Sequence, residues 1–179
     1  QFPEYNSFNF PCGEKHVRVT RANAYKNDQG EWLTDIKFDF KSNEDIIELL
    51  LLVNALKHMD CRVGRLYIPY LPFSRQDRVC ANGDSFSLEV MIDLINGINA
   101  ERVIIIDSHS DVVNNIRNLF VVEQHIVFEP YFLNRLSSSY VLVAPDKGSI
   151  QKIAKLAAAN AQENIIHCIK KRDPQTGKL

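Results

Sequence analysis

The sequence has 179 residues, of which 45% are hydrophobic and 24% are charged. This mixture is typical of one globular domain, or of one domain with part of a second, and it excludes a disordered, collagenous or low-complexity chain. Lys and Arg total 21 against 22 Asp and Glu, a net charge of −1. We therefore expect no nucleic-acid partner and no attraction to anionic membranes, and any phosphate site must be local.

Cysteine usage and hydropathy point to an intracellular protein. The longest apolar stretch, residues 46–53, contains Glu48 and is too short to span a bilayer, and no signal-peptide pattern precedes it. Reduced thiols are favoured over a disulfide or zinc framework, because four cysteines lie far apart without a Cys-x-x-Cys pair: Cys12, Cys61, Cys80 and Cys168. We expect a cytoplasmic protein. Because the chain opens at Gln1 and stops soon after a strand, we also expect a fragment of a longer protein.

Hydrophobic periodicity predicts alternating strands and helices along the first two thirds of the chain. Residues 34–40 alternate polar and apolar, which indicates a half-buried strand, and Ser42 is a candidate N-cap for a helix that reaches about His58. Further on we expect a strand, a polar loop, a helix and a fully buried strand at 65–69, 71–85, 86–95 and 103–106.

The last third repeats the same pattern, with strands predicted at 140–143 and 165–169 around a helix that contains residues 150–157. Alternation of this kind predicts an α/β fold with a doubly wound, mostly parallel sheet. In such sheets ligands bind beyond the carboxyl ends of the strands. Four segments that follow predicted strands are therefore candidate sites.

The first candidate is the segment 69–78, in which Arg75, Gln76, Asp77 and Arg78 follow two prolines. Arginine suits multidentate recognition of phosphate, and the Asp77 carboxylate could orient either guanidinium. The alternative is a network of ion pairs on the surface.

The second candidate is Asp107-Ser108-His109, where a carboxylate and an imidazole can approach one divalent cation at a strand end. The alternative has Asp107 capping the next helix and His109 exposed. Asp-x-His after a strand also opens the metallophosphoesterase pattern, but the later Gly-Asp-x-x-Asp and Asn-His elements of that pattern do not follow.

The third and fourth candidates follow the two late strands. Asp146 and Gly148 lie between a strand and a helix, where free backbone amides bind anions, although Asp-x-Gly is also a common turn. Lys170, Lys171 and Arg172 are either a phosphate clamp or a solvated flank.

Taken in order, these segments resemble the ribose-phosphate pyrophosphokinase family, also called phosphoribosyl pyrophosphate (PRPP) synthetase. The resemblance is carried by residues 68–78 (Ile-Pro-Tyr-Leu-Pro-Phe-Ser-Arg-Gln-Asp-Arg), 105–109, 143–148 and 169–172. Upstream, residues 10–14 look like the Phe-Ser-Asn/Asp-x-Glu segment of the family and residues 43–56 look like its Asn-Asp-x-Leu-Met-Glu-Leu helix. The resemblance covers nearly the whole chain.

The resemblance implies two similar phosphoribosyltransferase-like halves. We expect the first half at 1–138 to be nearly complete, without its opening strand and helix, and the second at 139–179 to be truncated. It also implies transfer of the β,γ-diphosphate of Mg-ATP to ribose 5-phosphate, giving PRPP and AMP. A fragment without the later ribose-5-phosphate loop would be inactive by itself.

The same resemblance implies roles for individual residues. Arg75, Gln76 and His109 would bind ATP, and Asp107, His109 and Asp146 would hold Mg²⁺. Asp146 and Gly148 would lie on the ribose-phosphate side, and Lys170 and Arg172 would be catalytic residues of a mobile loop. Phe10 would stack on adenine and Glu14 would accept a hydrogen bond from it, both at the site of a neighbouring subunit, so a homo-oligomer is expected.

Some positions depart from the family pattern. Cys12 replaces an Asn or Asp, Ser110-Asp111 follows His109 in place of Ala-Ser/Pro-Gln, and Ser149 replaces a glycine. Two other functions remain open: a non-catalytic subunit associated with PRPP synthetase that regulates partners, and a phosphoribosyltransferase, which shares the fold but not the segment 75–78.

Overall fold

The structure is a computed structural model that describes residues 1–128, 141–160 and 164–169. The chain divides into two compact units, Gln1–Val121 and Val122–Leu179. The boundary that the sequence predicts, between residues 138 and 139, lies outside the described residues and stays a prediction. None of the helices in the described ranges is long and apolar enough to cross a membrane.

The first unit contains a five-stranded sheet in the order β3-β4-β5-β6-β7. β4 pairs in parallel with β5, β5 pairs in parallel with β6, and the short β3 pairs antiparallel with β4. The predicted α/β fold with a mostly parallel sheet is confirmed. The strands of this sheet are β3 (Tyr25–Lys26), β4 (Trp32–Lys37), β5 (Cys61–Ile68), β6 (Arg102–Ile106) and β7 (Leu119–Val122).

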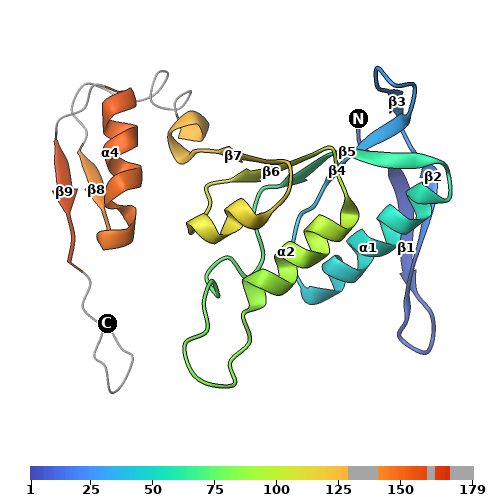
Figure 1. Ribbon diagram of the computed structural model, residues 1–179, viewed down its shortest axis with the longest axis horizontal. Coiled ribbons are helices and arrows are strands. Elements are labelled where there is room, and N and C mark those ends of the chain that lie inside the picture. The colour runs from blue at the N-terminus through green and yellow to red at the C-terminus, as the bar shows by residue number, and fades with distance from the viewer. Residues whose placement is uncertain (129–140, 161–163, 170–179) are drawn as a thin grey trace. The chain divides into compact units, whose positions relative to one another are not determined.

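Helices α1 (Asn43–Lys57) and α2 (Ser87–Ile98) connect the parallel strands and lie side by side on one face of the sheet (Figure 1). Ser42 is the N-cap of α1, as predicted, and the Asp45 carboxylate accepts the backbone N–H of Ser42 at 2.6 Å. The apolar stripe of α2 is buried against the strands, as its periodicity predicts, through Leu88, Met91, Ile92 and Ile95.

One prediction about burial is wrong in part. The strand at 103–106 was expected to be covered on both faces, and Val103 and Ile105 are indeed buried. Ile106, however, is 38% exposed. The reason is that β4, β5 and β6 follow one another across the sheet, so right-handed crossovers place α1 and α2 on the same face.

A β-hairpin that the sequence pattern does not predict precedes the sheet. β1 (Glu4–Asn9) pairs antiparallel with β2 (Lys15–Arg21), and β2 packs along α1 (Figure 1). The sequence signal is weak because every residue of β1 is exposed, so that no buried face creates an alternating pattern.

The second unit contains a strand, a helix and a parallel strand: β8 (Leu142–Ala144), α4 (Ile150–Ala159) and β9 (Ile165–His167). A short 3₁₀ helix, η2 (Lys147–Ser149), leads into α4. Leu142, Leu156 and Ala157 form its small core. This arrangement confirms the strand–helix–strand pattern predicted for the last third of the chain.

Candidate functional site

A pocket of about 520 Å³ lies at the carboxyl ends of β5 and β6 in the first unit. It combines the loop after β5 with the turn after β6, segments that are distant in sequence. Three of the predicted ATP-binding residues line it together, namely Arg75, Gln76 and His109. The other residues of its wall are Asp77, Arg78, Cys80, Asp84 and Ser85.

The loop after β5 is held by packed apolar side chains where it leaves the strand, and its charged side chains are exposed to solvent. Leu71 is buried in the core, and Phe73, with φ 60°, packs against Phe40 at 6.3 Å between ring centroids. The backbone then turns back, because Gln76 N–H donates to the Phe73 carbonyl at 2.8 Å. This geometry brings the arginines of the loop to the strand end while their side chains stay exposed.

The charged side chains of the pocket do not pair with one another. Within the described residues, Arg75, Asp77 and Arg78 form no ion pair, and Asp77 does not orient either guanidinium. The alternative of a surface ion-pair network is therefore not what the described part of the chain shows. Two unpaired guanidinium groups beside an imidazole form a surface suited to a phosphate-bearing ligand.

Cys80, Asp84 and Ser85 also line the pocket, although no sequence motif predicted them as site residues. The Asp84 carboxylate accepts the backbone N–H of Ala81 at 2.9 Å, and Gly83 has φ 92°, so the loop folds back on itself. The Asn82-Gly83 pair was the available signal, since it marks a turn that returns the chain toward α2.

Asp107 lies directly after β6 with φ 51°, in the left-handed region. Asp tolerates this conformation better than most residues, so the chain can leave the sheet sharply before His109. His109 faces the pocket, while η1 (Asp111–Asn115) begins after Ser110. Asp107 is not among the residues that line the pocket.

The described residues contain no preformed metal cage. Within the described ranges, no group of three or more His, Cys, Asp or Glu side chains is placed to hold a metal ion. A carboxylate at a strand end, such as that of Asp107, is nevertheless of the ligand type that Mg²⁺ takes, because Mg²⁺ is usually bound by one or two carboxylates together with phosphates and waters.

Asp146 and Gly148 lie in the second unit, at the start of η2. Asp146 is the N-cap of η2: its carboxylate Oδ1 accepts the backbone N–H of Ser149 at 3.0 Å, and Ser149 Oγ donates to the Asp146 carbonyl at 2.7 Å. Asp146 therefore caps a turn, which is the alternative to a ligand site that the sequence analysis gave for the Asp-x-Gly segment. Lys170 and Arg172 lie outside the described residues.

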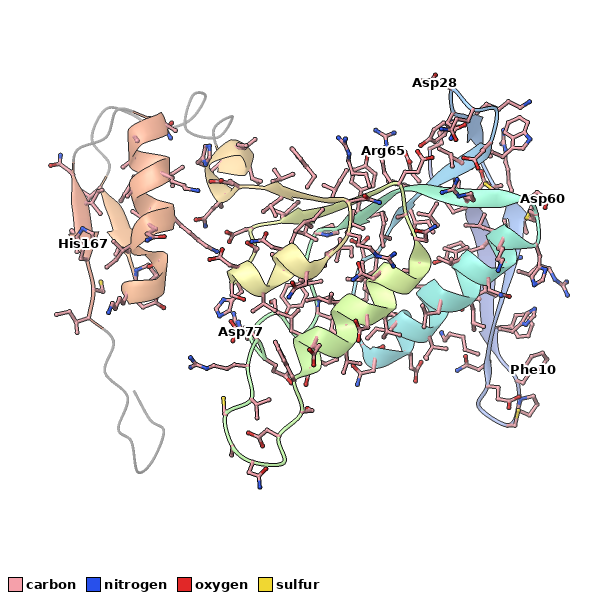
Figure 2. All side chains as sticks on the ribbon, in the orientation of Figure 1. Phe10, Asp28, Asp60, Arg65, Asp77 and His167 are labelled. Carbon is pink, nitrogen blue, oxygen red and sulfur yellow. The ribbon has the colours of Figure 1, made fainter. Side chains whose placement is uncertain are left out.

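Phe10 and Glu14 lie at the tip of the β1–β2 hairpin. The turn closes through Phe10 N–H to the Glu14 carbonyl and Gly13 N–H to the Phe10 carbonyl, both at 2.8 Å. Figure 2 shows Phe10 at the far end of the hairpin and Asp77 on the other side of the helix pair. Within one chain, the hairpin tip and the pocket are therefore separate.

The mostly parallel sheet and the pocket at the carboxyl ends of its strands define the class of the protein, an α/β fold with a strand-end site. Residues 36–99 match the model of the N-terminal domain of ribose phosphate pyrophosphokinase. A ribose-phosphate pyrophosphokinase of Thermococcus kodakarensis is 33% identical over 152 residues, which cover 83% of this chain and 51% of that protein. The resemblance is thus confirmed, and the chain belongs to the ribose-phosphate pyrophosphokinase family.

Two further comparisons agree. A ribose-phosphate pyrophosphokinase of Bacillus subtilis is 30% identical over 119 residues, 64% of this chain and 37% of that protein. The crystal structure of phosphoribosylpyrophosphate synthetase from Mycobacterium smegmatis superposes with a TM-score of 0.76 at 20% identity, covering 96% of this chain and 57% of that chain. The chain spans about half the length of the curated relatives that it matches.

Proposed function

We propose that the protein containing this chain is a ribose-phosphate diphosphokinase, which transfers the diphosphate of Mg-ATP to ribose 5-phosphate and releases PRPP and AMP. The observation that carries the proposal is the pocket in which Arg75, Gln76 and His109 meet at two strand ends. Relatives with this name and the family match support it.

In this proposal the pocket binds the phosphates of ATP. Arg75 and Arg78 supply positive charge, and neither forms an ion pair within the described residues. Phosphoryl-group transfer needs positioning and charge neutralisation more than a protein nucleophile. Asp107 would contribute a carboxylate oxygen to the Mg²⁺ that accompanies the nucleotide, and His109 would contact its phosphates.

Asp146 and Gly148 belong to the ribose-phosphate side of the proposed site, and Lys170 and Arg172 act as its catalytic cations. Cations of this kind lower the barrier when they meet charge that develops on the transferred group. The Asp146 carboxylate keeps a second oxygen, Oδ2, beyond the one that caps Ser149.

Phe10 and Glu14 are proposed to serve the nucleotide of a neighbouring subunit. The separation of the hairpin tip from Asp77 within one chain supports this arrangement (Figure 2). Phe10 is 45% exposed and can stack on a base that another chain holds. The active protein is therefore a homo-oligomer, which we place in the cytoplasm.

The direct test is AMP release by the full-length protein with Mg-ATP and ribose 5-phosphate. The proposal predicts AMP formation that depends on ribose 5-phosphate. Phe10→Ala and Arg75→Ala should each be impaired at limiting ATP. Mixing the two proteins under conditions of subunit exchange should partly restore activity, because hybrid oligomers would contain one intact site. Absence of any ribose-dependent AMP from the wild-type protein would instead favour the non-catalytic associated subunit.

A further inference from the structure

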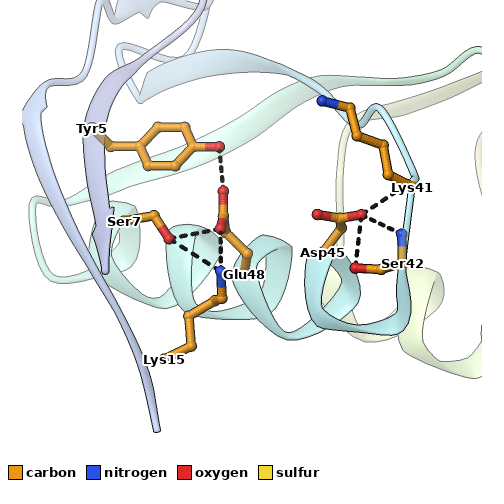
Figure 3. A network of polar contacts seen from close by, with 7 residues as sticks. All are labelled: Tyr5, Ser7, Lys15, Lys41, Ser42, Asp45 and Glu48. Atoms are coloured by element: carbon orange, nitrogen blue, oxygen red, sulfur yellow. Dashed lines mark hydrogen bonds and ion pairs between the residues drawn. The ribbon is translucent and has the colours of Figure 1, made fainter. Parts of the chain in front are cut away.

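The β1–β2 hairpin is attached to α1 through one carboxylate. Glu48 Oε1 accepts the Tyr5 hydroxyl at 3.0 Å, and Oε2 accepts the Ser7 hydroxyl at 2.6 Å (Figure 3). Lys15 Nζ donates to the same Oε2 at 3.0 Å. Tyr5 and Ser7 alternate along β1, and Lys15 begins β2, so both strands of the hairpin are joined to the same helical residue.

The opposite face of the hairpin is aromatic. Phe8 lies 5.3 Å from Phe10 and 5.1 Å from His16 between ring centroids, and Phe10 lies 5.7 Å from His16. Phe8 and His16 are direct cross-strand partners. The hairpin therefore directs its polar side chains to α1 and keeps an aromatic cluster exposed on its outer face.

Apolar packing contributes little to the position of this hairpin. All six residues of β1 are exposed, and in β2 the buried residue is Val17, 6% exposed, with Val19 packed partly against the same core. Two valines of β2 can hold a two-stranded hairpin against α1, but they only weakly determine the angle between the hairpin and the helix. The contacts of Glu48 supply the missing constraint because they join both strands of the hairpin to one point on the helix.

We propose that Glu48 is a positioning residue: by holding Tyr5, Ser7 and Lys15 it fixes the angle at which the hairpin presents Phe10 and its aromatic neighbours to a nucleotide. This inference rests on the proposed function, in which that nucleotide belongs to a neighbouring subunit. Glu48 touches no substrate and acts through the hairpin.

The environment of Glu48 strengthens its contacts with Tyr5, Ser7 and Lys15, which together we call the Glu48 clamp. The side chains of Lys15 and Glu48 are 18% and 22% exposed, so solvent screens their ion pair less than it screens a fully exposed pair. Burial raises the pKa of Glu48, but the hydrogen bonds from Ser7, Lys15 and Tyr5 outweigh it and the net direction is downward. The carboxylate therefore stays ionised at neutral pH.

The first arm of the test measures the hairpin itself. Hydrogen–deuterium exchange of the full-length protein should show amides of residues 4–21 exchanging about tenfold faster in Glu48→Ala, with the amides of β5 unchanged. Glu44→Gln, an exposed carboxylate of the same helix, is the matched control and should exchange like wild type. Unchanged hairpin exchange in Glu48→Ala would overturn the clamp.

The second arm measures what the clamp does. Glu48→Ala should raise the KM for ATP about three- to tenfold while kcat changes less than about twofold, since the chemical groups remain in place. The double variant Lys15→Glu/Glu48→Lys exchanges the two charges of the ion pair and should recover part of the lost affinity for ATP. Such a recovery would not occur if Glu48→Ala lost affinity only because it misfolds.

The outcomes separate the two proposals. Faster hairpin exchange with an unchanged KM would overturn the positioning role and leave the diphosphokinase proposal intact. A wild-type protein without activity would overturn the diphosphokinase proposal, and with it the positioning role, while the exchange data would still decide whether Glu48 clamps the hairpin.

Discussion

The Asp35 carboxylate of β4 lies against the Arg65 guanidinium of β5, whose Nε and Nη2 donate to Asp35 Oδ2 at 2.9 Å and 2.5 Å. Asp35 Oδ1 accepts the Arg65 backbone N–H and the Tyr25 hydroxyl, both at 2.9 Å. The register between β4 and β5 shifts at this position. A carboxylate that is 7% exposed thus joins three strands through four hydrogen bonds.

Removing the charge of Asp35 should destabilise the first unit. Burial raises the pKa of Asp35, but hydrogen bonds from Arg65 and Tyr25 outweigh it, so the pKa lies below its usual value of 3.8. We expect Asp35→Asn to lower the free energy of unfolding by about 1–3 kcal/mol near neutral pH. Urea titrations measure this difference, and Asp39→Asn, whose carboxylate is exposed and pairs with Lys37, should cost less than about 0.5 kcal/mol.

The pH dependence of the same variant has a defined sign. Because the folded pKa of Asp35 is depressed, its stabilising contribution is present above pH 3.8 and is lost as the pH falls through the folded value. Urea titrations of wild type and Asp35→Asn should therefore converge below about pH 3.8. A difference that grows as the pH falls would contradict the assignment.

Substitution by alanine should have opposite effects on stability at two glycines, Gly64 and Gly97. A Cβ at Gly64 would fall on the Tyr25 hydroxyl and 3.1 Å from Asp35 Oδ1, whereas a Cβ at Gly97 in α2 would meet nothing within 4 Å. We expect Gly64→Ala to cost about 1–2 kcal/mol of unfolding free energy, because the Tyr25 hydrogen bond must break. Gly97→Ala should stabilise by about 0.5–1 kcal/mol. Thermal melts of both variants check the pair, and Gly64→Ala should cost less in a Tyr25→Phe background.

Arg75 should contribute to nucleotide affinity. Loss of one charge-assisted phosphate contact weakens binding by about 10- to 100-fold, so calorimetry on full-length Arg75→Ala should show Mg-ATP bound that much more weakly. Arg62→Ala is the control, because Arg62 pairs with Glu31 and is not among the residues that line the pocket. Equal affinity in wild type and Arg75→Ala would remove the pocket from the proposed site.

Lys170 and Arg172 should matter for rate more than for ATP affinity. Loss of one group that meets charge in the transition state typically costs about two to three orders of magnitude in kcat. Full-length Lys170→Ala and Arg172→Ala should show this loss in AMP release with nearly unchanged ATP binding. Lys171→Ala, between them, is the control. Wild-type turnover in both variants would favour the solvated-flank alternative.

The sequence by itself determined the helices and strands in which buried apolar residues recur at a regular spacing. The N-cap at Ser42, the buried stripe of α2 and the strand at Arg102–Ile106 follow from local residue types and from the apolar periodicity of a face that packs against a core. The strand-end segments, taken together and in order, were sufficient to identify the family, because residues 75–78 (Arg-Gln-Asp-Arg) are highly specific and the other segments follow at similar spacing.

Tertiary structure decided what depends on residues far apart in the chain. The β1–β2 hairpin has no buried face in β1, so its position follows from Glu48 on a later helix, which local patterns do not encode. The same reason holds for Arg75 and His109: each follows its own strand, and their meeting in one pocket depends on β5 and β6 pairing in parallel, so that both carboxyl ends reach the same edge.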